Sequence, residues 1–148
     1  MNRAEFERYL QAFNDCDFET VGTYLADDLV FTNLPPLPRL DGREAFLEFY
    51  RDFKSRVRET LVPETLFVDK HGIALEARGT FEALQDLPDF PAAALREGDR
   101  FLLSGIVFYK TKGARFTSIR SVARLETILV RKSGERIDLG RTAYPGAR

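Results

Sequence analysis

The segment EFERYLQAF, residues 5–13, decides the fold expected for this chain. Its apolar side chains recur at Phe6, Tyr9, Leu10 and Phe13, which is the i, i+3, i+4, i+7 spacing of one helical face. Charged and amide side chains occupy the opposite face. The spacing therefore predicts an amphipathic helix that covers a core and turns the phenol of Tyr9 inward.

Two further helices and a strand are expected directly after this segment. Residues 14–17 have turn and N-cap chemistry, and helical spacing then continues over residues 18–26. Residues 29–33, LVFTN, are β-prone, and the prolines that follow exclude a helix or a central strand. Residues 46–58 again have one apolar helical face, on which Tyr50 lies. This pattern predicts a third helix that ends near residue 58.

Beyond residue 64 the pattern becomes that of β-strands. Strands are expected at residues 65–68, 73–84, 100–111 and 116–131. Residues 85–98 are too many for a tight hairpin, so they are expected to form a loop or short helix over a cavity mouth. We expect one domain over residues 1–148, in which residues 132–148 form a partly mobile tail or pack on a partner.

Composition narrows the classes of function. The chain has 148 residues, 44% of them hydrophobic, and its 22 basic and 23 acidic side chains give a net charge of −1. This balance favours neither nucleic acid nor acidic membranes as partners. Cys16 is the only cysteine, and no metal-spaced ligand set, phosphate loop or nucleophile motif is present, so we expect no metal and no cofactor. With no signal peptide or membrane span in the sequence, the expected location is the cytoplasm.

Three helices ahead of a strongly curved antiparallel sheet predict an α+β fold with a pocket between the helices and the sheet. Three segments carry a resemblance to a known family: RYLQAFNDCDF at 8–18, LADDLVFTN at 25–33 and LDGREAFLEFY at 40–50. They resemble the nuclear transport factor 2-like superfamily, in its SnoaL-like and ketosteroid-isomerase-like branch. The resemblance extends by topology over residues 5–125. It implies a cystatin-like cone in which three helices pack on a curved mixed or antiparallel sheet, often as a homodimer.

The resemblance also implies roles for particular positions. Tyr9 falls where ketosteroid isomerases have the oxyanion-hole tyrosine, and Tyr50 falls where they have a second tyrosine of the same hydrogen-bond network. Asn33, however, stands at the position of their catalytic aspartate, and Ile106 at that of their protonated aspartic acid. Ordinary steroid isomerisation is therefore not expected.

Limonene-epoxide-hydrolase-like members of the superfamily use an Asp, Arg, Asp set to activate water. Here the corresponding strand positions are Ala77, Gly79 and Ser121, so this hydrolysis is disfavoured as well. An amide cannot accept a proton as a carboxylate does, so Asn33 can only form hydrogen bonds. A general base would then have to be one of four candidates, namely Asp86, Asp89, His71 or a group of the substrate itself.

The candidate catalytic residues are Tyr9 and Asn33, which would polarise a substrate oxygen, and Tyr50, which would orient Tyr9. The candidate substrate-binding residues are Phe13, Phe31, Phe49, Phe81, Ser104, Ile106 and Ser121. Each assignment has a structural alternative. The tyrosines could be core residues with the hydroxyl at the rim, and Asn33 could bind loop backbone groups.

Two function classes stay open. The first is a cofactor-independent isomerase or lyase that acts on a small, largely apolar carbonyl or hydroxyl compound. The second is a non-catalytic module of the same fold that binds a small molecule or a protein.

The alternation of the third long strand also predicts a homodimer. The second face of this strand is apolar, which is excessive for a face in water, so a second copy is expected to cover it. That face consists of Phe101, Leu103, Val107 and Tyr109. Arg78, Arg120 and Arg124 are expected on the outer face of the sheet, in salt bridges or in the dimer interface.

Overall fold

The computed structural model describes residues 1–34 and 37–143. The helices are α1 (Arg3–Asn14), α2 (Phe18–Thr23) and α3 (Arg43–Arg56). The strands are β1 (Leu25–Thr32), β2 (Leu40–Asp41), β3 (Val57–Asp69), β4 (Gly72–Ala83), β5 (Arg100–Lys112), β6 (Arg115–Val130), β7 (Arg136–Asp138) and β8 (Thr142–Ala143). No helix among the described residues is long and apolar enough to cross a membrane.

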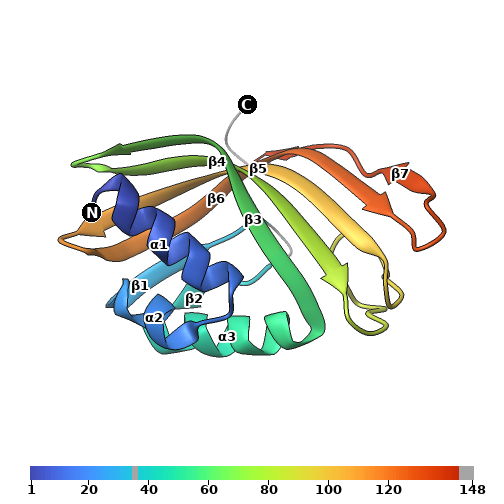
Figure 1. Ribbon diagram of the computed structural model, residues 1–148, viewed down its shortest axis with the longest axis horizontal. Coiled ribbons are helices and arrows are strands. Elements are labelled where there is room, and N and C mark those ends of the chain that lie inside the picture. Colours follow the sequence, from blue (N-terminus) through green and yellow to red (C-terminus); the bar gives the residue numbers. More distant parts are fainter. Residues whose placement is uncertain (35–36, 144–148) are drawn as a thin grey trace.

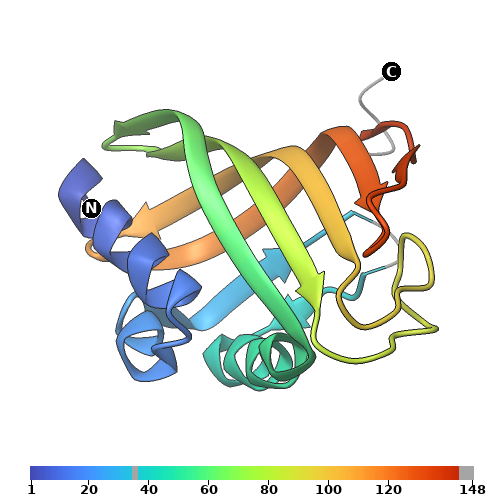
Figure 2. The same cartoon turned by 45° about the vertical axis from the view of Figure 1, so that its right-hand side comes forward.

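All the strands form one mixed sheet in the order β2-β1-β6-β5-β4-β3, with β7 and β8 also paired to β6. β1 runs parallel to β6, and the other pairings are antiparallel. The long strands curl so that the concave side of the sheet faces α1 and α3 (Figures 1 and 2). The predicted α+β fold, with helices packed on a curved sheet, is confirmed.

Local sequence explains where the helices begin. Asn2 caps α1 through a capping box, in which Asn2 Oδ1 accepts from the backbone N–H of Glu5 at 2.9 Å and Glu5 Oε2 accepts from the backbone N–H of Asn2 at 2.6 Å. Asp17 caps α2 by accepting from the N–H of Thr20. α3 begins after Gly42, whose φ of 95° favours glycine. These caps fix where the apolar faces of the helices meet the sheet.

The main core lies between α1, α3 and the concave face of the sheet. Its most deeply buried aromatic side chains are Phe6, Phe46 and Phe116. The rings of Phe6 and Phe116 meet edge to face, with 6.2 Å between centroids. The stripe on residues 5–13 therefore packs inward, as its spacing predicts.

Three segments differ from the sequence pattern. α2 ends at Thr23 and β1 begins at Leu25, whereas the pattern continued the helix to residue 26 and began the strand at residue 29. β3 begins at Val57, directly after α3, and not at residue 65. The tail contains the short strands β7 and β8. Residues 144–148, including Tyr144, lie outside the described residues, so the prediction for the end of the tail stays a prediction.

The apolar face that suggested a covering partner is in fact the inner face of β5. Phe101 and Tyr109 are buried against the core, which removes that argument for a dimer. The outer face of the sheet still exposes Phe67 on β3, at 69%, and Phe108 on β5, at 40%. The homodimer stays a prediction.

A buried carboxylate joins the loop at residues 84–99 to the end of β6. Asp99 accepts hydrogen bonds from the backbone N–H groups of Arg96 and Lys132, each at 3.0 Å, and from Arg131 Nη1 at 2.7 Å. Burial acts to raise the pKa of Asp99, but these hydrogen bonds outweigh it and leave the pKa below its usual value.

Asp99→Asn is therefore expected to lower the free energy of unfolding by roughly 1–3 kcal/mol, because it removes a charged acceptor and leaves Arg131 without a carboxylate. Thermal and urea denaturation would measure this. Asp86→Asn is the matched control, since exposed Asp86 accepts only the N–H of Glu97. Equal losses in the two variants would contradict the structural role of Asp99.

Candidate functional site

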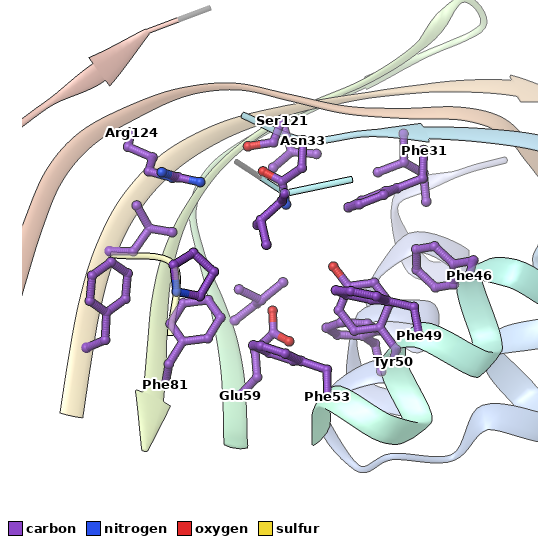
Figure 3. Close-up of a pocket in the computed structure, with 18 of the residues that line it drawn as sticks. Phe31, Asn33, Phe46, Phe49, Tyr50, Phe53, Glu59, Phe81, Ser121 and Arg124 are labelled. Atoms are coloured by element: carbon purple, nitrogen blue, oxygen red, sulfur yellow. The ribbon is translucent and has the colours of Figure 1, made fainter. Parts of the chain in front are cut away.

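A cavity of about 150 Å³ lies between α1, α3 and the concave face of the sheet. Aromatic and aliphatic side chains make most of its wall, and residues 90–92 of the loop after β4 contribute to it. A few polar side chains interrupt this apolar surface: Tyr9, Asn33, Tyr50, Glu59, Tyr109, Ser121 and Arg124. Figure 3 labels Asn33, Tyr50, Glu59, Ser121 and Arg124 among them. A concave, largely apolar space with few polar groups is typical of a small-molecule site.

Most of the residues predicted from the sequence line this cavity. They are Tyr9, Asn33, Tyr50, Phe13, Phe31, Phe49, Phe81 and Ser121. The structure thus brings together residues from both helical stripes, from the end of β1 and from the sheet. Their roles in binding or catalysis stay predictions.

Ser104 and Ile106 do not line the cavity, and their predicted placement was wrong. β5 alternates regularly against β4, so Leu103 and Val107 point to the cavity while Ser104 and Ile106 point to the other face. The sequence could not show this, because both faces of β5 are largely apolar. The choice between them depends on which face the helices cover.

The predicted hydrogen-bond network of the two tyrosines is not present. Within the described part of the chain, neither the Tyr9 nor the Tyr50 hydroxyl has a hydrogen-bond partner; the two residues are instead connected through the ring of Phe13. Tyr50 points its hydroxyl into the cavity (Figure 3). Burial raises the pKa of Tyr9 and of Tyr50 well above the usual value, so both phenols stay protonated and can donate to a ligand oxygen.

Asn33 partly has the structural role that was the alternative to catalysis, because it binds a backbone group of the loop. Its Oδ1 accepts a hydrogen bond from the backbone N–H of Leu34 at 2.8 Å, which stabilises the loop after β1. Asn33 also lines the cavity beside Ser121, on the wall opposite Tyr50 (Figure 3). With the oxygen occupied, the amide N–H groups are the part of Asn33 that can bind a ligand oxygen.

Glu59, the most unusual residue of the cavity, was not among the residues predicted from the sequence. This glutamate lies on β3 between Val57 and Leu61, two residues whose side chains share its inward face. Its side chain is only 6% exposed, and Oε2 has no hydrogen-bond partner among the described residues. A buried, unpaired carboxylate oxygen is uncommon and calls for an explanation.

The environment of Glu59 shifts its acidity. Burial raises its pKa to about 7, and the positive charge of Lys54 acts in the opposite direction. Near neutral pH, Glu59 therefore exists in both protonation states. This is the property that a general base or general acid needs.

Lys54 is itself buried on α3, against Phe13. Its ammonium group donates to the backbone carbonyl of Phe13 and lies 3.8 Å from the centre of the Phe13 ring. Burial lowers the pKa of Lys54, and Glu59 opposes this effect. Lys54 is not one of the cavity-lining residues, so it acts on Glu59 from behind the cavity wall.

Arg124 was predicted on the outer face but lines the cavity. β6 has a bulge just before this residue: Val107 pairs with Ser121 and Ile106 pairs with Ala123, so Val122 is an extra residue. The extra residue reverses the alternation and turns the Arg124 side chain inward (Figure 3). Simple alternation along the strand does not predict the inward orientation of Arg124, because a bulge breaks the two-residue period.

The three side chains considered as general bases lie elsewhere. Asp86, Asp89 and His71 are all exposed and do not line the cavity. Asp86 instead accepts the backbone N–H of Glu97 at 2.9 Å. In the described ranges, no group of three or more His, Cys, Asp or Glu side chains is placed to hold a metal ion.

A curved mixed sheet, three helices on its concave side and an apolar cavity between them define the cone-shaped α+β proteins of the nuclear transport factor 2-like class. A family model described as the SnoaL-like domain matches residues 6–119. The chain belongs to this SnoaL-like family.

Solved structures share the fold. A putative polyketide cyclase from Xanthomonas campestris pv. campestris is 22% identical with a TM-score of 0.67, over 80% of this chain and 86% of that one. A Mycobacterium tuberculosis LEH-like epoxide hydrolase is 20% identical with a TM-score of 0.64, over 80% and 78%. A computationally designed 17-OHP binder is 19% identical with a TM-score of 0.63, over 79% and 88%. A search of curated proteins found no match.

Proposed function

We propose that this protein is a cofactor-independent enzyme of the isomerase or lyase kind, which moves a proton on a small, largely apolar carbonyl or hydroxyl compound. One observation carries the proposal. Glu59 presents a buried, unpaired carboxylate oxygen to an apolar cavity, and its pKa is about 7. A carboxyl group kept near half protonation in such a place is suited to proton transfer.

In the proposed reaction, the Glu59 carboxylate takes a proton from the carbon next to a carbonyl group. The electron pair of the broken C–H bond forms a C=C bond, and the carbonyl oxygen takes up the negative charge. The Tyr50 hydroxyl and the Asn33 amide would donate hydrogen bonds to that oxygen. If a second C=C bond is conjugated with the enolate, the Glu59 acid returns the proton to the far carbon of that dienolate, which is isomerisation. If a hydroxyl group lies on the β-carbon, it takes the proton and leaves as water while an α,β C=C bond forms, which is a lyase reaction.

The first half of this reaction can be tested without knowing the natural substrate. In D2O, the protein should accelerate the exchange of α-hydrogens for deuterium in benzene-sized carbonyl compounds, such as cyclohexanone, acetophenone and phenylpyruvate. Proton NMR would follow the loss of the α-hydrogen signal. If the protein accelerates exchange in none of the three compounds, the proposal is wrong.

Tyr50→Phe is expected to slow this exchange roughly 10²-fold, because the enolate oxygen loses a donor in a site with little water. The substitution keeps the ring that packs on Phe13 and Phe46, so the fold should persist. Tyr24→Phe is the matched control, since Tyr24 does not line the cavity. An unchanged exchange rate in Tyr50→Phe, with the fold intact by circular dichroism, would remove Tyr50 from the proposed site.

The alternative is a binding module of the same fold, and it too has an observation in its favour. Asn33 Oδ1 is already occupied by the loop backbone, and a designed binder shares this fold. A ligand that co-purifies and is recovered unaltered after long incubation would support the alternative. Deuterium exchange that depends on Glu59 would exclude a purely binding role.

A further inference from the structure

Arg124 is the one permanent cation among the described residues that line the cavity. Among the described residues it forms no ion pair, and its one hydrogen bond to them is long, 3.5 Å from Nη2 to the backbone carbonyl oxygen of Leu34. A guanidinium group has five N–H donors, so the described residues use only a small part of the hydrogen-bonding capacity of Arg124. Arg124 is half-buried, and a charge partly withdrawn from water without a partner costs free energy.

The position of Arg124 is fixed by the backbone. The bulge at Val122 turns Arg124 inward, while Arg120, four residues earlier and before the bulge, stays on the outer face with its guanidinium over the ring of Phe108. Gly105 pairs with Arg124, and a Cβ added to Gly105 would lie 2.9 Å from the carbonyl oxygen of Ala123. The strands thus approach closely at the bulge, and the arginine is held at the cavity by rigid sheet structure.

Glu59 does not neutralise Arg124. Both side chains line the same cavity, but they form no salt bridge with each other. Figure 3 shows the Arg124 side chain at one end of the cavity, with Glu59 and the Tyr50 hydroxyl farther along it. The cavity therefore has a cationic end and a separate proton-transfer end, with apolar wall between them.

We propose that the ligand of this cavity carries a carboxylate, which pairs with the guanidinium group of Arg124 while the apolar body extends toward Tyr50 and Glu59. The inference rests on the proposed function and narrows its substrate class to small keto or hydroxy acids with an apolar body. A carboxylate matches the planar fork of an arginine with two parallel hydrogen bonds. A neutral carbonyl oxygen does not require the guanidinium group of Arg124, since Tyr50 and Asn33 already offer neutral hydrogen-bond donors.

Two probes of equal shape and different charge test the inference: phenylacetate and phenylacetamide. A cavity of about 150 Å³ suits a benzene-sized body. Binding would be measured at pH 6 by protein NMR titration. The intact protein is expected to bind phenylacetate roughly 10- to 100-fold more tightly than phenylacetamide.

Arg124→Gln should abolish this preference by weakening the binding of phenylacetate alone. Arg124→Lys, which keeps a positive charge, should retain part of the preference. Arg120→Gln is the matched control, because it removes the same charge from the outer face of the same strand. Equal binding of the two probes, no binding of phenylacetate, or the same loss in Arg120→Gln would each overturn the inference.

Glu59→Gln separates this inference from the proposed function. The variant should lose deuterium exchange and keep its preference for phenylacetate, because the substitution leaves Arg124 in place. A preference for phenylacetate in a protein that exchanges no α-hydrogens would refute the proposed reaction alone. Deuterium exchange that needs Glu59 but depends neither on Arg124 nor on the charge of the ligand would refute only the inference that the ligand carries a carboxylate.

Discussion

Glu59→Gln is expected to slow deuterium exchange at the α-carbon by a factor on the order of 10²–10⁴, the usual contribution of a positioned general base. The amide has the shape of the carboxyl group but cannot accept a proton. In the unsubstituted protein the exchange rate should rise with pH and level off above about pH 7, because the carboxylate is the active form and the pKa of Glu59 is about 7.

The matched control is Glu126→Gln, which removes a carboxylate from the exposed surface of β6. It should leave both the rate and its pH dependence unchanged. If Glu59→Gln and Glu126→Gln behave alike, Glu59 is not the base. The other charged or titratable groups around the site are Tyr9, Tyr50, Tyr109, Lys54 and Arg124. The raised pKa of each tyrosine keeps it neutral across this pH range.

The same substitution is expected to change the pH dependence of stability. The folded pKa of Glu59, about 7, lies above its ordinary value of 4.5, so the folded protein binds this proton more tightly than the unfolded chain. The stability that this proton contributes is full below about pH 4.5 and is lost as the pH rises through about 7. Glu59→Gln should therefore become more stable relative to the unsubstituted protein by roughly 2–3 kcal/mol between pH 5 and pH 8.5.

Urea denaturation at several pH values would measure this difference. The glutamine variant keeps its amide uncharged at every pH, so the comparison isolates the ionisation of one buried group. A difference in unfolding free energy that stays constant from pH 5 to pH 8.5 would show that the carboxyl group of Glu59 ionises as it does in water. Such a result would also remove the main support for its role as a base.

The helical part of the fold could be predicted from sequence because its signal is local. The apolar positions Phe6, Tyr9 and Phe13 repeat within three turns, and the stripe that contains Tyr50 does the same. Both helices bury the face that the spacing selects. The two tyrosines and the helical phenylalanines Phe13 and Phe49 consequently reached the cavity wall.

The inward face of each strand was harder to predict, because it depends on the elements that pack against the strand. In β5 both alternating sets are largely apolar, so the sequence favoured Ser104 and Ile106 where the structure has Leu103 and Val107. Arg124 was misplaced for another reason: one extra residue in β6 reverses the alternation.

The sequence does carry a signal for the burial of Glu59. In the run Val57, Arg58, Glu59, Thr60, Leu61, the glutamate occupies the apolar phase of the alternation. An acidic residue at such a position is either a surface residue of an irregular strand or a buried carboxylate. The sequence pattern places the start of this strand at residue 65 and not at Val57, so it does not identify Glu59 as a candidate for burial.

The arrangement of Lys54 separates two properties that most sites combine. Its charge lies against the Phe13 ring and lowers the proton affinity of Glu59, although Lys54 takes no part in the cavity wall. Residues that line the wall determine which molecule fits, whereas a residue behind it adjusts the pH at which the carboxyl group ionises. Selection could therefore retune the acidity of this site, or its shape, one without the other.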